Sequence, residues 1–148
     1  ELEPHPEGGY FKEVYRSSLE LTSPANNKIR KSVTDIYFLL IEGQISRFHR
    51  VDHEEIWNFY EGNPLELIEM DEDSYKLRPY QLGSKKEVLY KHTIQPGNWQ
   101  AARSLGEYSL VGCTVAPGFE FEDFSFLSER EEELQKAIGI NPDFKNFI

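Results

Sequence analysis

The chain has 148 residues and a formal net charge of −10, from 26 acidic and 16 basic residues. Hydrophobic residues make up 39% and aromatic residues 14% of the chain, which excludes an intrinsically disordered protein. The acidic balance argues against nucleic-acid binding and against anionic membranes, because both partners attract a basic surface. The length predicts one domain, residues 1–148, whose core is large enough to fold without disulfides.

The single cysteine and the short apolar runs bear on the cellular compartment and on membrane insertion. Cys113 is the only cysteine and so has no internal disulfide partner, which favours a reducing, cytoplasmic compartment. We expect it to be a buried apolar thiol in a strand. The apolar run "IYFLLI", residues 36–41, is too short to cross a membrane. The basic run "KIRK", Lys28 to Lys31, is interpreted as a solvated turn.

Most of the chain reads as short strands separated by turn signals. The turns recur at about 8–12 residues, which is typical of an all-β sandwich or barrel. Pro96 and Gly97 lie in the order that a type II turn requires. The predicted strands are residues 10–16, 34–41, 44–50, 55–61, 65–70, 75–82, 87–95, 99–104 and 108–116.

Only the C-terminus has the pattern of a helix, in "SEREEELQKAIG", residues 128–139. Ser128 and Glu131 have the spacing of a capping box, and acidic residues fill the first turn. Gly139 is predicted just past the helix end. The predicted fold is therefore all-β with a short C-terminal helix.

Strand alternation predicts which side chains share a face. Ile45, Arg47 and His49 should face one way, and Ser46, Phe48 and Arg50 the other. Glu55, Trp57 and Phe59 should also share a face. Large side chains on both faces suggest that one face packs on a second sheet and the other lines a cavity or contacts a partner subunit.

Two spaced motifs carry the most specific signal. The first reads G-x5-H-x-V-x3-E-x6-G, formed by Gly43, His49, Val51, Glu55 and Gly62. It resembles the first cupin motif, G-x5-H-x-H-x3-E-x6-G, with valine in place of the second histidine. The stretch "QPGNWQAARS" resembles a degenerate second cupin motif, with Gln100 in place of the third histidine and Ser104 in place of the asparagine.

Three longer segments, residues 2–17, 46–67 and 99–126, resemble one subfamily of single-domain cupins long labelled a domain of unknown function. The resemblance implies a double-stranded β-helix, the cupin jelly-roll barrel, close to the fold of the deoxysugar epimerases of the rhamnose pathway. It also implies a homodimer. It supplies no agreed reaction.

The same motifs predict that the protein binds no metal and needs no other cofactor. Cupin metal sites usually use three imidazoles and one carboxylate, but here Val51 offers no lone pair and Gln100 only a weak carbonyl oxygen. An alternative is a metal-dependent cupin that uses His49, His53 and Glu55. Asp52 indicates a turn before His53, however, so we expect His53 to be an exposed loop histidine.

The leading functional prediction is a small-molecule pocket inside the barrel of a metal-independent isomerase or epimerase, acting on a sugar-like or other polar carbonyl compound. His49 and Glu55 are the predicted catalytic acid–base pair. The alternative is a non-catalytic cupin that binds a small ligand. His92 is interpreted as structural, and His5 lies in a shaped Pro- and Gly-rich loop of unassigned role. The predicted ligand-binding residues are Arg47, Tyr37, Trp57, Phe59 and Gln100.

Overall fold

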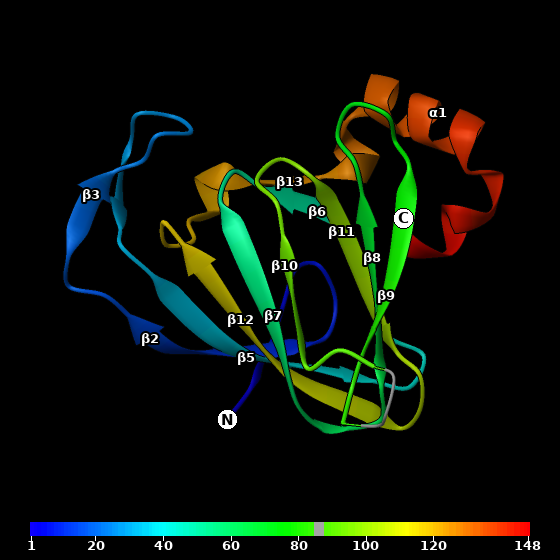
Figure 1. Cartoon of the computed structure of the whole chain (residues 1–148), viewed down its shortest axis with the longest axis horizontal. Coiled ribbons are helices and arrows are strands. Elements are labelled where there is room, and N and C mark those ends of the chain that lie inside the picture. The colour runs from blue at the N-terminus through cyan, green and yellow to red at the C-terminus, as the bar shows by residue number, and fades with distance from the viewer. Residues whose placement is uncertain (85–87) are drawn as a thin grey trace.

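Two antiparallel sheets form the body of the protein in the computed structural model, which describes residues 1–84 and 88–148 (Figure 1). The first sheet has the order β1-β2-β5-β12-β7-β10 and the second the order β13-β6-β11-β8-β9. Strands of the first sheet are β1 (Glu3–Pro4), β2 (Tyr10–Arg16), β5 (Thr34–Ile41), β12 (Tyr108–Ala116), β7 (Glu54–Gly62) and β10 (Lys91–Ile94). Strands of the second are β13 (Phe124–Phe126), β6 (Ile45–Val51), β11 (Trp99–Ser104), β8 (Leu65–Met70) and β9 (Leu77–Leu82).

The main core lies between the two sheets. Phe38 and Trp57 of the first sheet meet Leu65 and Leu67 of the second, and all four are almost completely buried. The predicted all-β double-stranded β-helix is therefore confirmed. The predicted strand over residues 87–95 is shorter than expected: β10 covers Lys91–Ile94, and residue 87 lies outside the described residues. The Pro96-Gly97 turn is confirmed, because Gly97 has a φ of 82° and the Asn98 amide donates to the Gln95 carbonyl.

A second core covers the outer face of the second sheet. The C-terminal helix α1 (Glu131–Ile140) and the following 3-10 helix η3 (Pro142–Phe147) lie beside the second sheet (Figure 1). Phe48 and Trp99 of the sheet pack against apolar side chains of these helices. Leu127, in the 3-10 helix η2 (Leu127–Glu129), is fully buried in this core. No helix in the described ranges is long and apolar enough to span a membrane.

The predicted helix boundaries were wrong at both ends. Ser128 lies in η2 and does not cap α1, because the buried Leu127 holds the η2 turn against the sheet. The residue that directly precedes α1 is Arg130. Gly139 lies inside the helix, which ends at Ile140 and is followed by the capping residue Asn141. The Asn141 side-chain amide donates to the carbonyl of Tyr75, and Pro142 disfavours continuation of the helix.

The interpretation of the "KIRK" run as a solvated turn was also wrong. Ile29–Lys31 forms β4, which pairs with β3 (Glu20–Thr22) in a separate two-stranded sheet. Arg30 is buried, because its guanidinium makes two 2.6 Å hydrogen bonds to the carboxylate of Asp123. Asp123 belongs to the 3-10 helix η1 (Phe121–Asp123), 93 residues further along the chain, a separation at which sequence patterns give no signal.

Candidate active site

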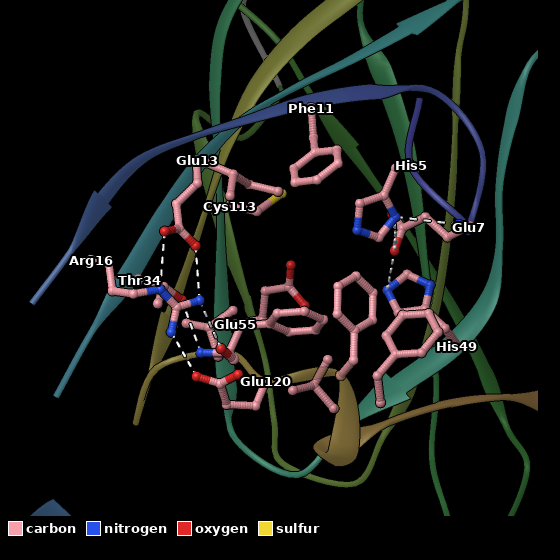
Figure 2. Close-up of a pocket in the computed structure, with 16 residues that line it drawn as sticks. His5, Glu7, Phe11, Glu13, Arg16, Thr34, His49, Glu55, Cys113 and Glu120 are labelled. Atoms are coloured by element: carbon pink, nitrogen blue, oxygen red, sulfur yellow. Dashed lines mark hydrogen bonds and ion pairs between the residues drawn. The ribbon is translucent and has the colours of Figure 1, made fainter. Parts of the chain in front are cut away.

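A cavity of about 100 Å³ lies between the sheets, where the N-terminal loop and the segment of residues 119–124 close over strands β5, β6, β7 and β12 (Figure 2). Its lining combines phenylalanines with several ionisable side chains. The imidazoles of His5 and His49 and the carboxyl group of Glu7 lie together on one side of the cavity (Figure 2). A cluster of Arg16, Glu13 and Glu120 lies on the other side (Figure 2).

A β-bulge in β6 decides which side chains enter this cavity. His49 pairs with Gln100, whereas Ser46 pairs with Ala102, so two residues of β6 lie opposite one residue of β11. The bulge breaks the predicted alternation. Ser46 and His49 face the interior, whereas Phe48 joins the second core on the outer face.

His49 is fully enclosed and its ring orientation is set by the backbone. Its Nδ1 lies 2.8 Å from the carbonyl oxygen of Arg47, and the ring stacks on Phe124 with centroids 5.1 Å apart. Because a carbonyl only accepts, Nδ1 carries the hydrogen and Nε2 carries the lone pair of a neutral ring. Burial lowers the pKa of His49, which favours this neutral form.

Glu55 reaches the same cavity from β7. Its carboxylate accepts a hydrogen bond from the side-chain amide of Gln100, and the Cys113 thiol lies beside it. Burial raises the pKa of Glu55 to about 7. Cys113 is buried as predicted, but it lines the cavity, and burial followed by the Glu55 charge raises the pKa of its thiol. Glu55 is thus a carboxyl that can be protonated or ionised near neutral pH.

The N-terminal loop supplies two site residues, His5 and Glu7, that were not predicted. The loop is closed by hydrogen bonds from the His5 amide to the Gly9 carbonyl and from the Gly8 amide to the His5 carbonyl. Gly8 has a φ of 114°, and a Cβ there would overlap the carbonyl oxygen of Ile45. Glycine therefore permits the close approach that points His5 and Glu7 into the cavity. The only sequence signal was the run of prolines and glycines around them.

Glu7 lies between two imidazoles. Its Oε1 accepts a 2.9 Å hydrogen bond from Ser46, and its Oε2 is 3.4 Å from His5 Nδ1 and 3.3 Å from His49 Nε2. Burial raises the pKa of Glu7 and lowers that of His5. All three groups are therefore pushed toward their neutral forms.

The opposite side of the cavity carries a compensated charge cluster. Arg16 donates to both carboxylate oxygens of Glu13, at 3.0 and 2.9 Å, and to Glu120 at 2.7 Å. Phe119 and Phe121 lie next to this cluster, edge to face with centroids 5.0 Å apart. This side of the site therefore combines two phenylalanine rings with a guanidinium whose charge is compensated by two carboxylates.

Most of the predicted ligand-binding residues do not line the cavity. Arg47 lies on the bulge and turns outward: its guanidinium donates to the Pro6 carbonyl and covers the ring of Phe126. Tyr37 is 44% exposed on the outer face of the first sheet. Trp57 and Phe59 belong to the main core. Gln100 lies directly behind Glu55, with its carbonyl oxygen accepting a 2.7 Å hydrogen bond from the indole of Trp57.

The residues at the cupin metal positions do not fit a metal. Val51 lines the cavity without a donor atom, and the carbonyl of Gln100 already accepts from Trp57. His53 is not among the residues that line this cavity and was wrongly expected to be exposed: it is 3% exposed, with Nε2 bonded to Ser23 Oγ at 2.7 Å. Within residues 1–84 and 88–148, no three His, Cys, Asp or Glu side chains form a group that could hold a metal ion.

His92 lies outside the cavity lining. Its ring stacks on Tyr80 with centroids 3.6 Å apart, and its Nε2 lies 3.1 Å from Glu69. Asn98 donates to the same carboxylate at 2.7 Å. The stacked rings connect β10 of the first sheet with β9 of the second, which agrees with a structural role for His92.

Comparison with known proteins places this architecture among relatives of unassigned activity. An uncharacterised yeast protein, YML079W of Saccharomyces cerevisiae, is 29% identical over 91% of this chain and 74% of its own length. Protein SO0799 of Shewanella oneidensis is 31% identical with a TM-score of 0.85, and a hypothetical protein of Leishmania major is 28% identical with a TM-score of 0.84. Each of these two comparisons covers 99% of this chain and 90% of the other.

More distant structures share the fold alone. Oxalate decarboxylase of Bacillus subtilis matches 98% of this chain and 36% of its own, with 14% identity and a TM-score of 0.65. The family model described as "Cupin superfamily (DUF985)" matches residues 1–127, which include every cavity residue described above. The chain therefore belongs to the DUF985 family of the cupin superfamily.

Proposed function

We propose that the protein is a metal-independent isomerase or epimerase of a small, uncharged, sugar-like carbonyl compound. The observation that carries the proposal is the pairing of Glu55, a buried carboxyl with a pKa of about 7, with the neutral imidazole of His49 in one cavity. Groups poised near neutral pH are the effective acids and bases of proton transfer. A barrel interior that served only as a core would favour apolar side chains at these positions.

The chemistry needs only proton movement. The ionised carboxylate of Glu55 removes the proton from the carbon beside the substrate carbonyl, and the electron pair of that C–H bond forms a C=C bond. The carbonyl oxygen takes a proton from the imidazole side of the cavity, which gives an enediol. Glu55 can return the proton to the neighbouring carbon on the same face, while the neighbouring hydroxyl loses its proton to the imidazole side of the cavity, and this yields the isomer. The epimer forms when a second group of the cavity delivers a proton to the opposite face of the original carbon, the first oxygen gives its proton back, and Glu55 releases its proton to solvent.

The electrostatics of the lining indicate the charge of the substrate. Arg16 is the one guanidinium among the described lining residues, and Glu13 and Glu120 already neutralise it. Arg47, which was predicted to bind the ligand, points away from the cavity. Because the remaining charged groups are carboxylates, an anionic ligand is disfavoured and an uncharged one is favoured.

Solvent exchange tests the proposal without knowledge of the product. The protein is incubated in D2O with a panel of neutral aldoses and ketoses, and proton NMR follows loss of the signal next to the carbonyl. At least one compound should exchange with the wild-type protein, and Glu55→Gln and His49→Gln should abolish the exchange. The matched control is Glu66→Gln, which changes a carboxylate that pairs with Arg103 within the second sheet and does not line the cavity.

Exchange that persists in Glu55→Gln would refute the proposed base. Tight binding of a panel member with no exchange would favour the alternative, a non-catalytic cupin that binds a small ligand. A calorimetric titration of the same panel distinguishes the two.

We also propose that the protein is a cytoplasmic homodimer. Tyr37, Leu39 and Ile41 alternate with buried core residues of β5, so the outer face of the first sheet is apolar. Tyr60 extends this face by an edge-to-face contact with Tyr37. An exposed apolar sheet face is typical of a subunit interface. Sedimentation of the wild type should give a dimer at micromolar concentration, and Tyr37→Lys with Tyr60→Lys should give a monomer.

A further inference from the structure

The hydrogen positions on His5 and His49 are set by backbone groups. His49 Nδ1 faces the carbonyl oxygen of Arg47, so its hydrogen lies on Nδ1 and its Nε2 is a lone pair when the ring is neutral. The Glu7 backbone amide donates to His5 Nδ1 at 3.3 Å, so that nitrogen is a lone pair as well. Each ring therefore presents an acceptor, and not a donor, toward the Glu7 side chain.

Glu7 Oε2 lies 3.3 Å from His49 Nε2, whose lone pair faces it, and 3.4 Å from His5 Nδ1, whose lone pair accepts the Glu7 amide hydrogen (Figure 2). An ionised Glu7 beside a neutral His49 would place two acceptors together with no hydrogen between them, which is unfavourable in a buried site. The arrangement is satisfied when one proton is added to the group.

The other neighbours of Glu7 favour keeping that proton on the carboxyl. Ser46 Oγ donates to Oε1 and leaves Oε2 free to carry the hydrogen. The nearby Arg47 guanidinium is engaged by the Pro6 carbonyl and Phe126, while Glu55 and the Cys113 thiol face Glu7 from the other sheet. A protonated Glu7 leaves Glu7, His5 and His49 all neutral, whereas an imidazolium would place two opposite charges side by side inside the barrel.

We propose that Glu7 is a proton donor of the cavity, held protonated at neutral pH and sharing its hydrogen with His49 Nε2. The loop of residues 4–9 then has a defined purpose, because it delivers this carboxyl and His5 to the site. The part of the inference that concerns turnover rests on the proposed function: Glu7 gives its proton to the substrate oxygen as Glu55 removes the proton from carbon. The enediol returns that proton to Glu7 as the carbonyl forms again, so the protons balance over one cycle.

The protonation state can be measured on the ligand-free protein. Carbon-detected NMR of protein labelled at the glutamate side-chain carboxyl reports Glu7, assigned by its absence in Glu7→Gln, and nitrogen NMR of labelled histidine reports His5 and His49. We expect Glu7 to remain protonated at neutral pH, with both rings neutral. The control Glu66→Gln should leave the Glu7 and histidine signals unchanged.

An ionised Glu7 beside a doubly protonated His49 at neutral pH would overturn the proposal. The Glu7→Gln variant provides a second test, because its amide N–H can still donate to His49 Nε2 but cannot transfer a proton. We expect His49 to keep its tautomer in this variant and the D2O exchange to fall by about 100-fold or more. Unchanged exchange would also overturn it. If no carbonyl compound exchanges with the wild type, a protonated Glu7 still supports the inference and only the proposed function fails.

Discussion

Gln100 donates a hydrogen bond to Glu55 and accepts one from the indole of Trp57, from the β11 position that a metal-binding cupin gives to a histidine. Both ends of this amide are engaged, so Gln100 orients a carboxyl in place of binding a metal. Burial raises the pKa of Glu55 to about 7, and the hydrogen bond from Gln100 opposes that rise.

Restoring the two missing histidines should create a metal site. Val51 lines the cavity, and Gln100 pairs directly with His49 across the strands, so Val51→His with Gln100→His should surround Glu55 with three imidazoles. We expect zinc or nickel to bind about tenfold or more tightly than to the wild type. Isothermal titration calorimetry measures the gain. Gln100→His alone is the control and should gain less; equal affinities for all three proteins would contradict the prediction.

The elevated pKa of Glu55 should appear in the pH dependence of stability. The folded protein keeps a proton on Glu55 up to about pH 7, whereas the unfolded chain releases it near the usual value of 4.5. The contribution is therefore fully present below pH 4.5 and is lost as the pH rises through 7. Between pH 4.5 and pH 7, the unfolding free energy of the wild type should therefore fall by about 3 kcal/mol more than that of Glu55→Gln.

Urea unfolding of the wild type and Glu55→Gln at a series of pH values measures that difference. The comparison of two variants cancels groups that titrate equally in both, including Asp71, whose pKa is lowered by hydrogen bonds from Ser74. Parallel pH curves for the two proteins would show that Glu55 titrates normally.

Gly8→Ala should displace the N-terminal loop and remove His5 and Glu7 from the cavity. The added Cβ would overlap the Ile45 carbonyl, and the φ of 114° is unfavourable for any residue with a side chain. Hydrogen exchange at the Arg47 amide, which bonds to the Glu7 carbonyl, should become faster while the core strands stay protected.

Gly139→Ala is the matched control for that substitution. Gly139 lies inside α1, and an added Cβ there meets no neighbouring atom within 4 Å. Alanine should therefore stabilise the helix by about 0.5 to 1 kcal/mol and leave the loop unchanged. Equal effects of the two substitutions on exchange at Arg47 would contradict the close contact at Gly8.

Asp123→Asn should loosen the segment of residues 119–124 that covers the cavity. Removal of the charge leaves Arg30 buried without its partner, which costs about 3 to 5 kcal/mol of unfolding free energy. Phe121, the first residue of η1, and Phe124, which follows η1, should lose their fixed positions, and their ring signals in NMR should broaden. Lys28→Ala breaks the neighbouring exposed pair with Glu122 and should cost less than about 1 kcal/mol.

The sequence alone determined most of the long strands, the Pro96-Gly97 turn and the two residues at the centre of the candidate site. Strands β5, β8, β11 and β12 begin and end at the predicted residues, because period-two patterns and flanking turn residues are local signals. The cupin spacing placed His49 and Glu55 in one cavity, since motif positions follow the register of the barrel strands.

The tertiary structure decided everything that depends on irregular backbone or on contacts between distant segments. One bulge in β6 turned Arg47 outward, and a two-residue period cannot show where a strand gains an extra residue. Glu7 reaches His49 across 42 positions through a loop with no periodic pattern, and Arg30 meets Asp123 across 93. Such contacts form because buried charges and acceptors require partners, a requirement that acts only once the chain has folded.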